Sequence, residues 1–136
     1  MVEVVHGYKC EKCHDRGNKQ RVVLIVHSPN ILIVQLKRFE WDGAKVNTQV
    51  AIPTILDLDS YRDVDNDDSM RYELTAVIKH LGNLNQGHYI CSAKASDNQW
   101  YHFDDRKKSV GTVSEAISGS KNSFSPYILF YQRKEE

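Results

Sequence analysis

The sequence contains few of the residues that mark specialised structural classes. Among its 136 residues are three cysteines and three prolines, and 18 Lys and Arg balance 18 Asp and Glu. An odd number of cysteines argues against a structural disulfide framework. A formal net charge of zero provides no global field to attract phosphate backbones or anionic lipid. We therefore expect no nucleic-acid partner and no membrane partner.

Long apolar segments and leader-like features are absent as well. The longest apolar stretches, residues 22–26 and 31–34, are far shorter than the roughly 20 residues that cross a bilayer. The N-terminal segment lacks the basic start, apolar run and small-residue cleavage site of a secretory signal. We expect an intracellular location, cytoplasmic or nuclear, in which thiols stay reduced.

What the sequence does provide is apolar material for a single core. Hydrophobic residues make up 40% and charged residues 26% of the chain, as in globular domains. No segment repeats at a fixed period, and no Pro-rich or Gly/Ser-rich linker divides the chain. Residues 1–136 are therefore expected to form a single unit.

The distribution of apolar residues indicates a chain that is mainly antiparallel β. Apolar residues occupy every second position from Tyr72 to Ile78, which is the period of a half-buried strand. Thr112 and Glu115 have the spacing of a capping box and predict the one clear helix, ending near Ile117. The other β-type runs are 21–26 and 31–36, which we expect in the centre of the sheet, and 88–94, 99–103 and 127–131. The predicted class is α+β.

Three further features have ordinary structural interpretations. The acidic segment 61–70 predicts a solvated loop, since it lacks the Gly and terminal Glu of a calcium-binding EF-hand. Lys37 and Arg38 follow a strand and are interpreted as a solvated edge. Trp41 and Trp100 are expected in the core or at its rim.

The hairpin from residue 88 to residue 104 carries a possible catalytic pair. If its loop has an odd length, as in 94–98, Ala93 pairs with Gln99 and His88 lies opposite Asp104. Opposed Cβ atoms lie about 4.5 to 5.5 Å apart, which lets a carboxylate accept a hydrogen bond from the imidazole. An even loop length would instead bring Asp105 opposite His88.

An imidazole oriented by a carboxylate is the usual general base for a nucleophilic thiol or hydroxyl. The alternative is a surface pair without chemistry. Gly82 and Gly87 flank a polar loop just before His88, and a residue without a Cβ atom lets a substrate backbone approach closely. A flexible turn is the simpler interpretation of the same glycines.

One long pattern resembles a known family. From Tyr72 to Tyr89 the chain reads Tyr-x-Leu-x-Ala-Val-x-x-His-x-Gly-x4-Gly-His-Tyr, which resembles the histidine box of the ubiquitin-specific proteases. These are cysteine peptidases that cleave after the C-terminal glycine of ubiquitin. Further similar segments occur in the family's order: Tyr8-x-Cys10-x-x-Cys13, Leu36-Lys37-Arg38-Phe39, Trp100-Tyr101-His102-Phe103-Asp104-Asp105 and Tyr127-Ile128-Leu129-Phe130-Tyr131.

The resemblance implies a fold and a set of roles. It implies the C-terminal half of a papain-like cysteine protease, comprising the palm and part of the fingers. His88 would be the general base, Asp104 its orienting residue and Asp105 an auxiliary polar group. The resemblance also implies four residues that bind the substrate, the tail of ubiquitin: His80, Gly82, Gly87 and Tyr89.

The family's N-terminal box, with its nucleophilic cysteine, has no counterpart in this sequence. We therefore expect a deubiquitinating thiol protease of which this chain is the C-terminal part, inactive alone. Its expected partners are ubiquitin, ubiquitin conjugates and the missing N-terminal half. The alternative is a non-catalytic module that binds ubiquitin or another protein.

Cys10 and Cys13 have the spacing of a zinc knuckle, but tetrahedral zinc needs four ligands. The resemblance implies a second cysteine pair in the missing part, so only half of a structural zinc site is present. His6 and His14 are possible substitutes, and unliganded surface thiols are the alternative. No cofactor is expected for catalysis.

Overall fold

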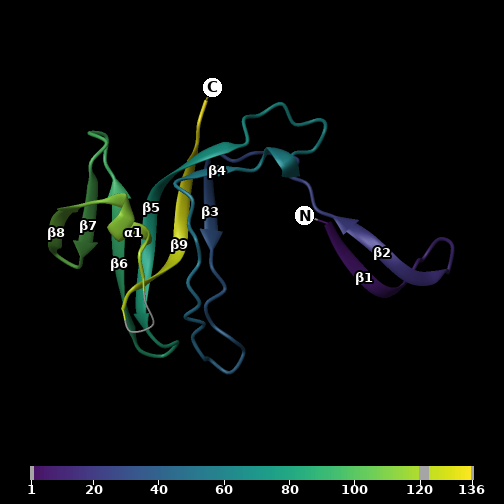
Figure 1. Cartoon of the computed structure of the whole chain (residues 1–136), viewed down its shortest axis with the longest axis horizontal. Helices are drawn as coiled ribbons and strands as arrows, with labels where there is room; N and C mark the ends of the chain where they lie inside the picture. The colour runs from purple at the N-terminus through teal and green to yellow at the C-terminus, as the bar shows by residue number, and fades with distance from the viewer. Residues whose placement is uncertain (1, 120–122, 136) are drawn as a thin grey trace.

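The computed structural model describes residues 2–119 and 123–135. Within these ranges, the chain forms one large antiparallel sheet and a separate two-stranded hairpin that projects from it as an arm (Figure 1). The predicted class, mainly antiparallel β with one short α-helix, is confirmed.

Seven strands make up the large sheet. Its hydrogen-bonded order is β3 (Ile31–Gln35), β9 (Ser125–Arg133), β5 (Arg71–Gly82), β6 (Gly87–Lys94), β7 (Trp100–Asp104) and β8 (Lys107–Gly111), and β4 (Ile55–Asp57) pairs with β5. The arm consists of β1 (Val2–Lys9) and β2 (Arg16–Val22). A 3-10 helix, η1 (Asp59–Tyr61), and the helix α1 (Val113–Ile117) complete the described elements.

One strand predicted near the N-terminus is wrong beyond its first two residues, and the position predicted for another is wrong. The strand predicted at 21–26 ends at Val22, where β2 reaches Val2 at the start of β1 and loses its pairing partner. Val22, Val23 and Leu24 are exposed, so no core face continues the strand. The strand at 31–36 does form, as β3, but at the edge of the sheet beside β9 and not in its centre.

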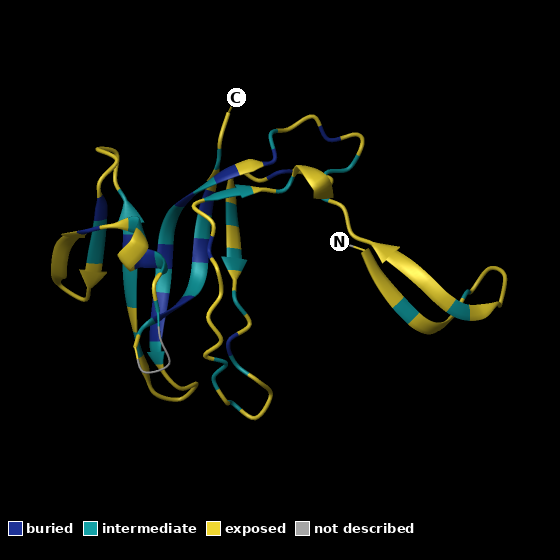
Figure 2. Cartoon of the chain, viewed as in Figure 1, coloured by how far each residue is buried: buried dark blue, intermediate teal, exposed yellow. Residues whose placement is uncertain are grey.

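The core is centred on β5 and β9, where Figure 2 shows much of the buried chain. Tyr72, Leu74 and Val77 on β5 are buried against Leu129 and Tyr131 on β9. The predicted alternation of buried residues does not continue through Ala76 and Ile78, which are only partly buried. The reason is that the β5–β9 register shifts between Leu74 and Ala76. Such an irregularity moves the following residues to the other face, so Val77 enters the core.

Helix α1 begins as predicted. The Thr112 hydroxyl accepts a hydrogen bond from the Glu115 amide at 3.3 Å, and the Glu115 carboxylate accepts one from the Thr112 amide at 2.7 Å. This capping box satisfies N–H groups that the first helical turn leaves without partners. The helix packs against the core through the buried Ala116. Across the described residues, no helix has the length and apolar character needed to cross a membrane.

The β6–β7 hairpin forms with a register two residues away from the predicted one. Lys94 pairs with Trp100 and Cys91 pairs with Phe103, so His88 is not directly opposite Asp104. The connecting loop is residues 95–99, closed by one hydrogen bond that the Ala95 amide donates to the Gln99 carbonyl at 2.9 Å. Because the loop still has an odd length, His88 and Asp104 keep the same face of the sheet.

Arg38 and Trp41 lie where the sequence did not predict them. Arg38 is only 4% exposed because its guanidinium donates to the carbonyls of Val46, Thr48 and Pro126. Trp41 is 98% exposed because it occupies the tip of a tight turn closed between Glu40 and Ala44. Trp100 is buried in the core, and residues 62–70 form a loop, as expected.

Candidate active site

His88 and Asp104 form a close pair at the open end of the β6–β7 ladder. Nε2 of His88 lies 2.6 Å from Oδ1 of Asp104, and both side chains are partly exposed. Backbone pairing between β6 and β7 stops at Cys91 and Phe103, before it reaches either residue. Other neighbours hold them in place: His88 pairs with Leu81 on β5, and Asp104 pairs with Lys107 on β8.

The pKa of His88 and the orientation of its ring are those of a base held by a carboxylate. The hydrogen bond to the Asp104 carboxylate raises the pKa of His88; desolvation opposes this rise, and the charges of Asp104 and Asp105 raise the pKa further. Because Nε2 faces the carboxylate, Nδ1 is the nitrogen left to exchange a proton with a reacting group. The pair can therefore hold and move a proton at Nδ1.

Asp105 is a weaker neighbour of the same imidazole. Its Oδ2 atom lies 4.0 Å from Nε2 of His88, beyond hydrogen-bonding distance, and its side chain is largely exposed. Asp105 begins the two-residue turn between β7 and β8 with a φ of 49°, a conformation that aspartate tolerates better than most residues. The geometry thus distinguishes Asp104 from Asp105.

The turn that precedes His88 requires its two glycines. Gly82 has a φ of 113°, and a Cβ atom there would overlap the Gln86 carbonyl oxygen. A Cβ atom at Gly87 would overlap the imidazole of His80. Between them, the Asn83 carboxamide oxygen accepts hydrogen bonds from two amides of the same turn. The turn is therefore ordered by its own hydrogen bonds and places bare backbone beside His88.

His80 packs against this turn at Gly87, and Tyr89 packs on His80. His80 is 2% exposed, and its ring packs 4.7 Å from that of Tyr89, with Phe39 and Tyr127 also beside it. Burial and the charge of Lys45 lower the pKa of His80, which favours the neutral ring. Of the residues predicted to bind the substrate, Gly82 and Gly87 therefore lie in the turn, His80 packs against Gly87, and the exposed Tyr89 packs on His80.

Sequence reasoning missed Phe124, which also contacts His88. The two ring centroids are 5.8 Å apart in an edge-on arrangement. Phe124 also lines an open groove of about 380 Å³ with Lys79, Ile90 and Ser118. No spacing rule links positions 88 and 124, so only the fold brings them together.

None of the three cysteines lies beside the free nitrogen of His88. Cys91 is three residues along the same strand and points to the opposite face, and burial raises the pKa of its thiol. Cys10 and Cys13 lie in the turn between β1 and β2, at the outer end of the arm (Figure 1). Within the described residues the pair therefore has no nucleophilic thiol.

The Cys10–Cys13 turn has features of a metal-binding knuckle. The His14 amide donates to the Cys10 carbonyl at 2.8 Å, and hydrogen bonds from the backbone amides of Cys13 and Lys12 lower the pKa of the Cys10 thiol. A lowered thiol pKa favours the thiolate, which is the form that binds zinc. Among residues 2–119 and 123–135, however, no third ligand group joins these two thiols. The residues present thus fit half of a zinc site.

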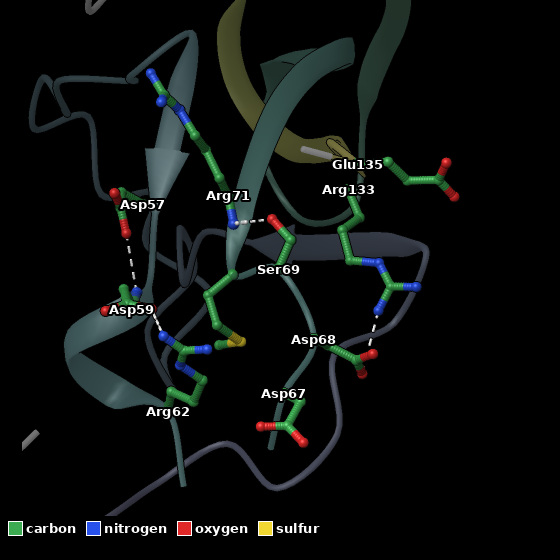
Figure 3. A pocket seen from close by; sticks show the side chains of 10 residues that line it. Asp57, Asp59, Arg62, Asp67, Asp68, Ser69, Arg71, Arg133 and Glu135 are labelled. Atoms are coloured by element: carbon green, nitrogen blue, oxygen red, sulfur yellow. Dashed lines mark hydrogen bonds and ion pairs between the residues drawn. The ribbon is translucent and has the colours of Figure 1, made fainter. Parts of the chain in front are cut away.

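A larger cavity, of about 650 Å³, lies at the other end of β5 (Figure 3). Its walls are charged: Asp68 pairs with Arg133 at 3.2 Å, and Asp59 pairs with Arg62. The residues drawn in Figure 3 include neither histidine nor cysteine, and the Ser69 hydroxyl accepts a hydrogen bond from the Arg71 amide. This cavity therefore lacks a base and nucleophile pair, and the catalytic candidate remains at His88.

Comparison with known sequences gives one consistent family. The profile of the family described as ubiquitin carboxyl-terminal hydrolase matches residues 2–131. Ubiquitin carboxyl-terminal hydrolase 9 of Arabidopsis thaliana is 41% identical over 129 residues, covering 91% of this chain and 14% of the relative. Human ubiquitin carboxyl-terminal hydrolase 42 is 34% identical, covering 96% of this chain and 10% of the relative.

Solved structures show the same fold. The chain matches a structure of the SAGA Ubp8/Sgf11/Sus1/Sgf73 DUB module bound to ubiquitin aldehyde, with a TM-score of 0.75 and 28% identity. That match covers 99% of this chain and 31% of the solved chain. The chain therefore spans less than a third of the length of the proteins it resembles.

Proposed function

The chain belongs to the ubiquitin carboxyl-terminal hydrolase family, and on that premise we propose that it supplies the base-bearing half of a deubiquitinating thiol protease. The reaction would hydrolyse bonds at the C-terminal glycine of ubiquitin. The observation that carries the proposal is the 2.6 Å contact between His88 Nε2 and Asp104 Oδ1, which leaves Nδ1 free for proton transfer. Ubiquitin and ubiquitin conjugates are the proposed partners.

The proposed reaction is acyl transfer through a thioester. A cysteine thiolate, paired with protonated His88, attacks the glycyl carbonyl, and Nδ1 of His88 then gives its proton to the departing amine. In the second step Nδ1 takes a proton from water as the water attacks the thioester, which releases the ubiquitin carboxylate and the thiol. The raised pKa of His88 supports this assignment, because an imidazolium stabilises a neighbouring thiolate.

Asp104 and the 82–87 turn would have distinct roles in this reaction. Asp104 would keep the imidazole in the tautomer and orientation that direct Nδ1 toward the thiol. The bare backbone of Gly82 and Gly87 would let the extended, glycine-ended tail of ubiquitin pass close to His88. His80 and Tyr89 would support the turn, and Asp105 would be an auxiliary polar group.

We propose that the nucleophile comes from another polypeptide segment, the N-terminal part of the catalytic domain. None of the three cysteines occupies the position that Nδ1 of His88 requires. Residues 1–136 would then be one structural unit of the catalytic domain and inactive alone. A mechanism that depends on a free thiol also suits a reducing intracellular compartment, either cytoplasm or nucleus.

For zinc, we propose that Cys10 and Cys13 supply two of four ligands and that the other two come from the segment that provides the nucleophile. Zinc in such a site would stabilise the arm and would take no part in the chemistry. The lowered pKa of Cys10 supports this proposal.

The test is cleavage of a ubiquitin C-terminal amide by the chain alone and by the chain mixed with the nucleophile-bearing segment of a relative. We expect no turnover from the chain alone and turnover from the mixture, lost on His88→Ala. Turnover by the chain alone would overturn the proposed division of the site. Turnover by the mixture that survives His88→Ala would overturn the role of His88.

A second candidate is a ubiquitin-binding module without catalysis, which the absence of a thiol beside His88 favours for the chain in isolation. Binding of ubiquitin by the chain, combined with no turnover in any mixture, would support this alternative.

A further inference from the structure

A chain of three hydrogen-bonded side chains lies next to the His88–Asp104 pair. Ser92 Oγ is 2.6 Å from Nδ1 of His102, and Nε2 of His102 is 3.3 Å from a carboxylate oxygen of Glu115. Ser92 and His102 are directly opposed on β6 and β7. Both share a sheet face with His88 and Asp104, because even separations along a strand keep side chains on one face.

This link lies one rung inside the end of the backbone pairing between the two strands. The β6–β7 ladder ends at Cys91 and Phe103, the rung adjacent to Ser92 and His102. Beyond that rung, the distance between His88 and Asp104 depends on side-chain contacts. The Ser92–His102 hydrogen bond is therefore positioned to limit the separation of the strands beside the catalytic pair.

Glu115 extends the link to helix α1. Its carboxylate is itself held by the Thr112 amide at 2.7 Å, and its backbone carbonyl accepts a hydrogen bond from the buried Lys79 of β5 at 2.8 Å. Helix α1 is thus tied to β7 through His102 and to β5 through Lys79, across the intervening β6.

Gly111 makes room for the link. A Cβ atom at Gly111 would overlap the His102 imidazole, so only glycine leaves space for the ring between Ser92 and Glu115. The two ring nitrogens of His102 thus join the Ser92 hydroxyl on one side to the Glu115 carboxylate on the other. Ser92 is 2% exposed and cannot meet a substrate, so the arrangement acts through geometry.

We propose that Ser92, His102 and Glu115 form a positioning relay that keeps Asp104 within hydrogen-bonding distance of His88. This proposal rests on the proposed function, since the relay would affect catalysis only through the position of Asp104 relative to the base, His88. His102 is a positioning residue. Loss of the relay lets β6 and β7 separate at their open end, which lengthens the His88–Asp104 hydrogen bond.

The experiment is an NMR titration of the His88 imidazole in the full chain, which needs no enzymatic activity. Asp104→Ala is the reference variant, and it should lower the His88 pKa toward the ordinary histidine value of about 6.5. His102→Ala should produce about half of that decrease or more. The conservative variant His102→Gln, whose amide can both accept and donate, should restore most of the original pKa. The matched control is His6→Ala, which removes a histidine hydrogen-bonded at 3.2 Å to Asn18 on the distant arm and should leave His88 unchanged.

Two outcomes separate this proposal from the one it rests on. If Asp104→Ala leaves the His88 pKa unchanged, the catalytic pair itself is wrong, and the relay with it. If Asp104→Ala lowers the pKa and a folded His102→Ala does not, the relay is wrong and the proposed function stands. Should His102→Ala fail to fold, the His88 pKa is measured in Ser92→Ala and Gly111→Ala instead, since each disturbs the His102 ring without removing it. The relay predicts a lowered His88 pKa in both variants.

Discussion

His88 and Asp104 are in direct contact, 2.6 Å between Nε2 and Oδ1, although the β6–β7 register does not pair them. If the ladder continued, Asp104 would face Ile90, so the imidazole reaches its carboxylate along the diagonal of the sheet. Diagonal neighbours are within reach of large side chains but are not held together by backbone hydrogen bonds. The pair therefore depends on the side chains and loops around it.

Replacing Asp104 should reduce catalysis far more than replacing Asp105. Asp104 is in hydrogen-bond contact with His88, whereas Asp105 lies 4.0 Å away and is largely exposed. In the chain combined with a nucleophile-bearing segment, we expect Asp104→Ala to lower kcat by about 100-fold and Asp105→Ala by less than about tenfold. The measurement is the steady-state rate of ubiquitin amide cleavage, and the reverse ranking would assign the orienting role to Asp105.

The His88–Asp104 pair should stabilise the fold at low pH more than at high pH. Because its hydrogen bond to the Asp104 carboxylate raises the pKa of His88, the folded state binds the proton more tightly than the unfolded state. The stabilisation is complete below the unfolded-state pKa of about 6.5 and disappears as the pH rises through the raised folded-state pKa. Urea unfolding of the wild type and Asp104→Asn should therefore differ most in mild acid. The exposed Asp65→Asn is the control, and a difference that grows with pH would contradict the assignment.

Gly82→Ala should destabilise the chain, whereas Gly17→Ala should not. Gly82 combines a φ of 113° with a position where a Cβ atom overlaps the Gln86 carbonyl oxygen, whereas nothing lies within 4 Å of a Cβ atom at Gly17. We expect a loss of about 1–3 kcal/mol in the free energy of unfolding for Gly82→Ala. For Gly17→Ala we expect a change within about 0.5 kcal/mol. Chemical denaturation measures both, and equal effects would show that the turn accepts a side chain.

Arg38→Ala should be among the more damaging single substitutions of a charged residue. The buried guanidinium is a hydrogen-bond donor to the carbonyls of Val46, Thr48 and Pro126, which would be left without partners. We expect a loss of about 2–4 kcal/mol in the free energy of unfolding. The control Arg21→Ala removes only an exposed ion pair with Glu3 and should cost less than about 1 kcal/mol. A small effect at Arg38 would mean that water replaces its hydrogen bonds.

The chain alone should bind zinc too weakly to retain it. Cys10 and Cys13 provide two ligands, and the described residues add no third to them. Dialysis of the zinc-loaded chain against metal-free buffer should therefore remove the metal, and Cys13→Ser should abolish the residual binding. Metal analysis provides the measurement. Retention of one equivalent would show that two further ligands come from within the chain.

Much of the candidate site could be read from local sequence features. The parity of the hairpin loop is enough to set His88 and Asp104 on one face, and a register error of two residues preserves that parity. The capping box depends on positions 112 and 115 alone, and it forms as predicted. The glycines at 82 and 87 mark a turn because their backbone geometry excludes a side chain.

Other features depend on residues that are distant in the chain. The irregularity after Leu74, which brings Val77 into the core, arises where β5 meets β9. The burial of Arg38 requires a carbonyl of Pro126, at a separation of 88 residues. A single sequence contains no local signal for such contacts.

The amino-acid sequence by itself determined that the segments of β3, β5, β6, β7 and β9 form strands, that α1 forms a helix, and that His88 and Asp104 share a face, because all of these follow from local patterns along the chain. Tertiary structure alone decided that Phe124 packs on His88 and that Ser92, His102 and Glu115 join β6, β7 and α1. The physical reason is that these contacts form only when β5, β6, β7 and α1 pack together, and the sequence spacing of their members carries no information about that packing.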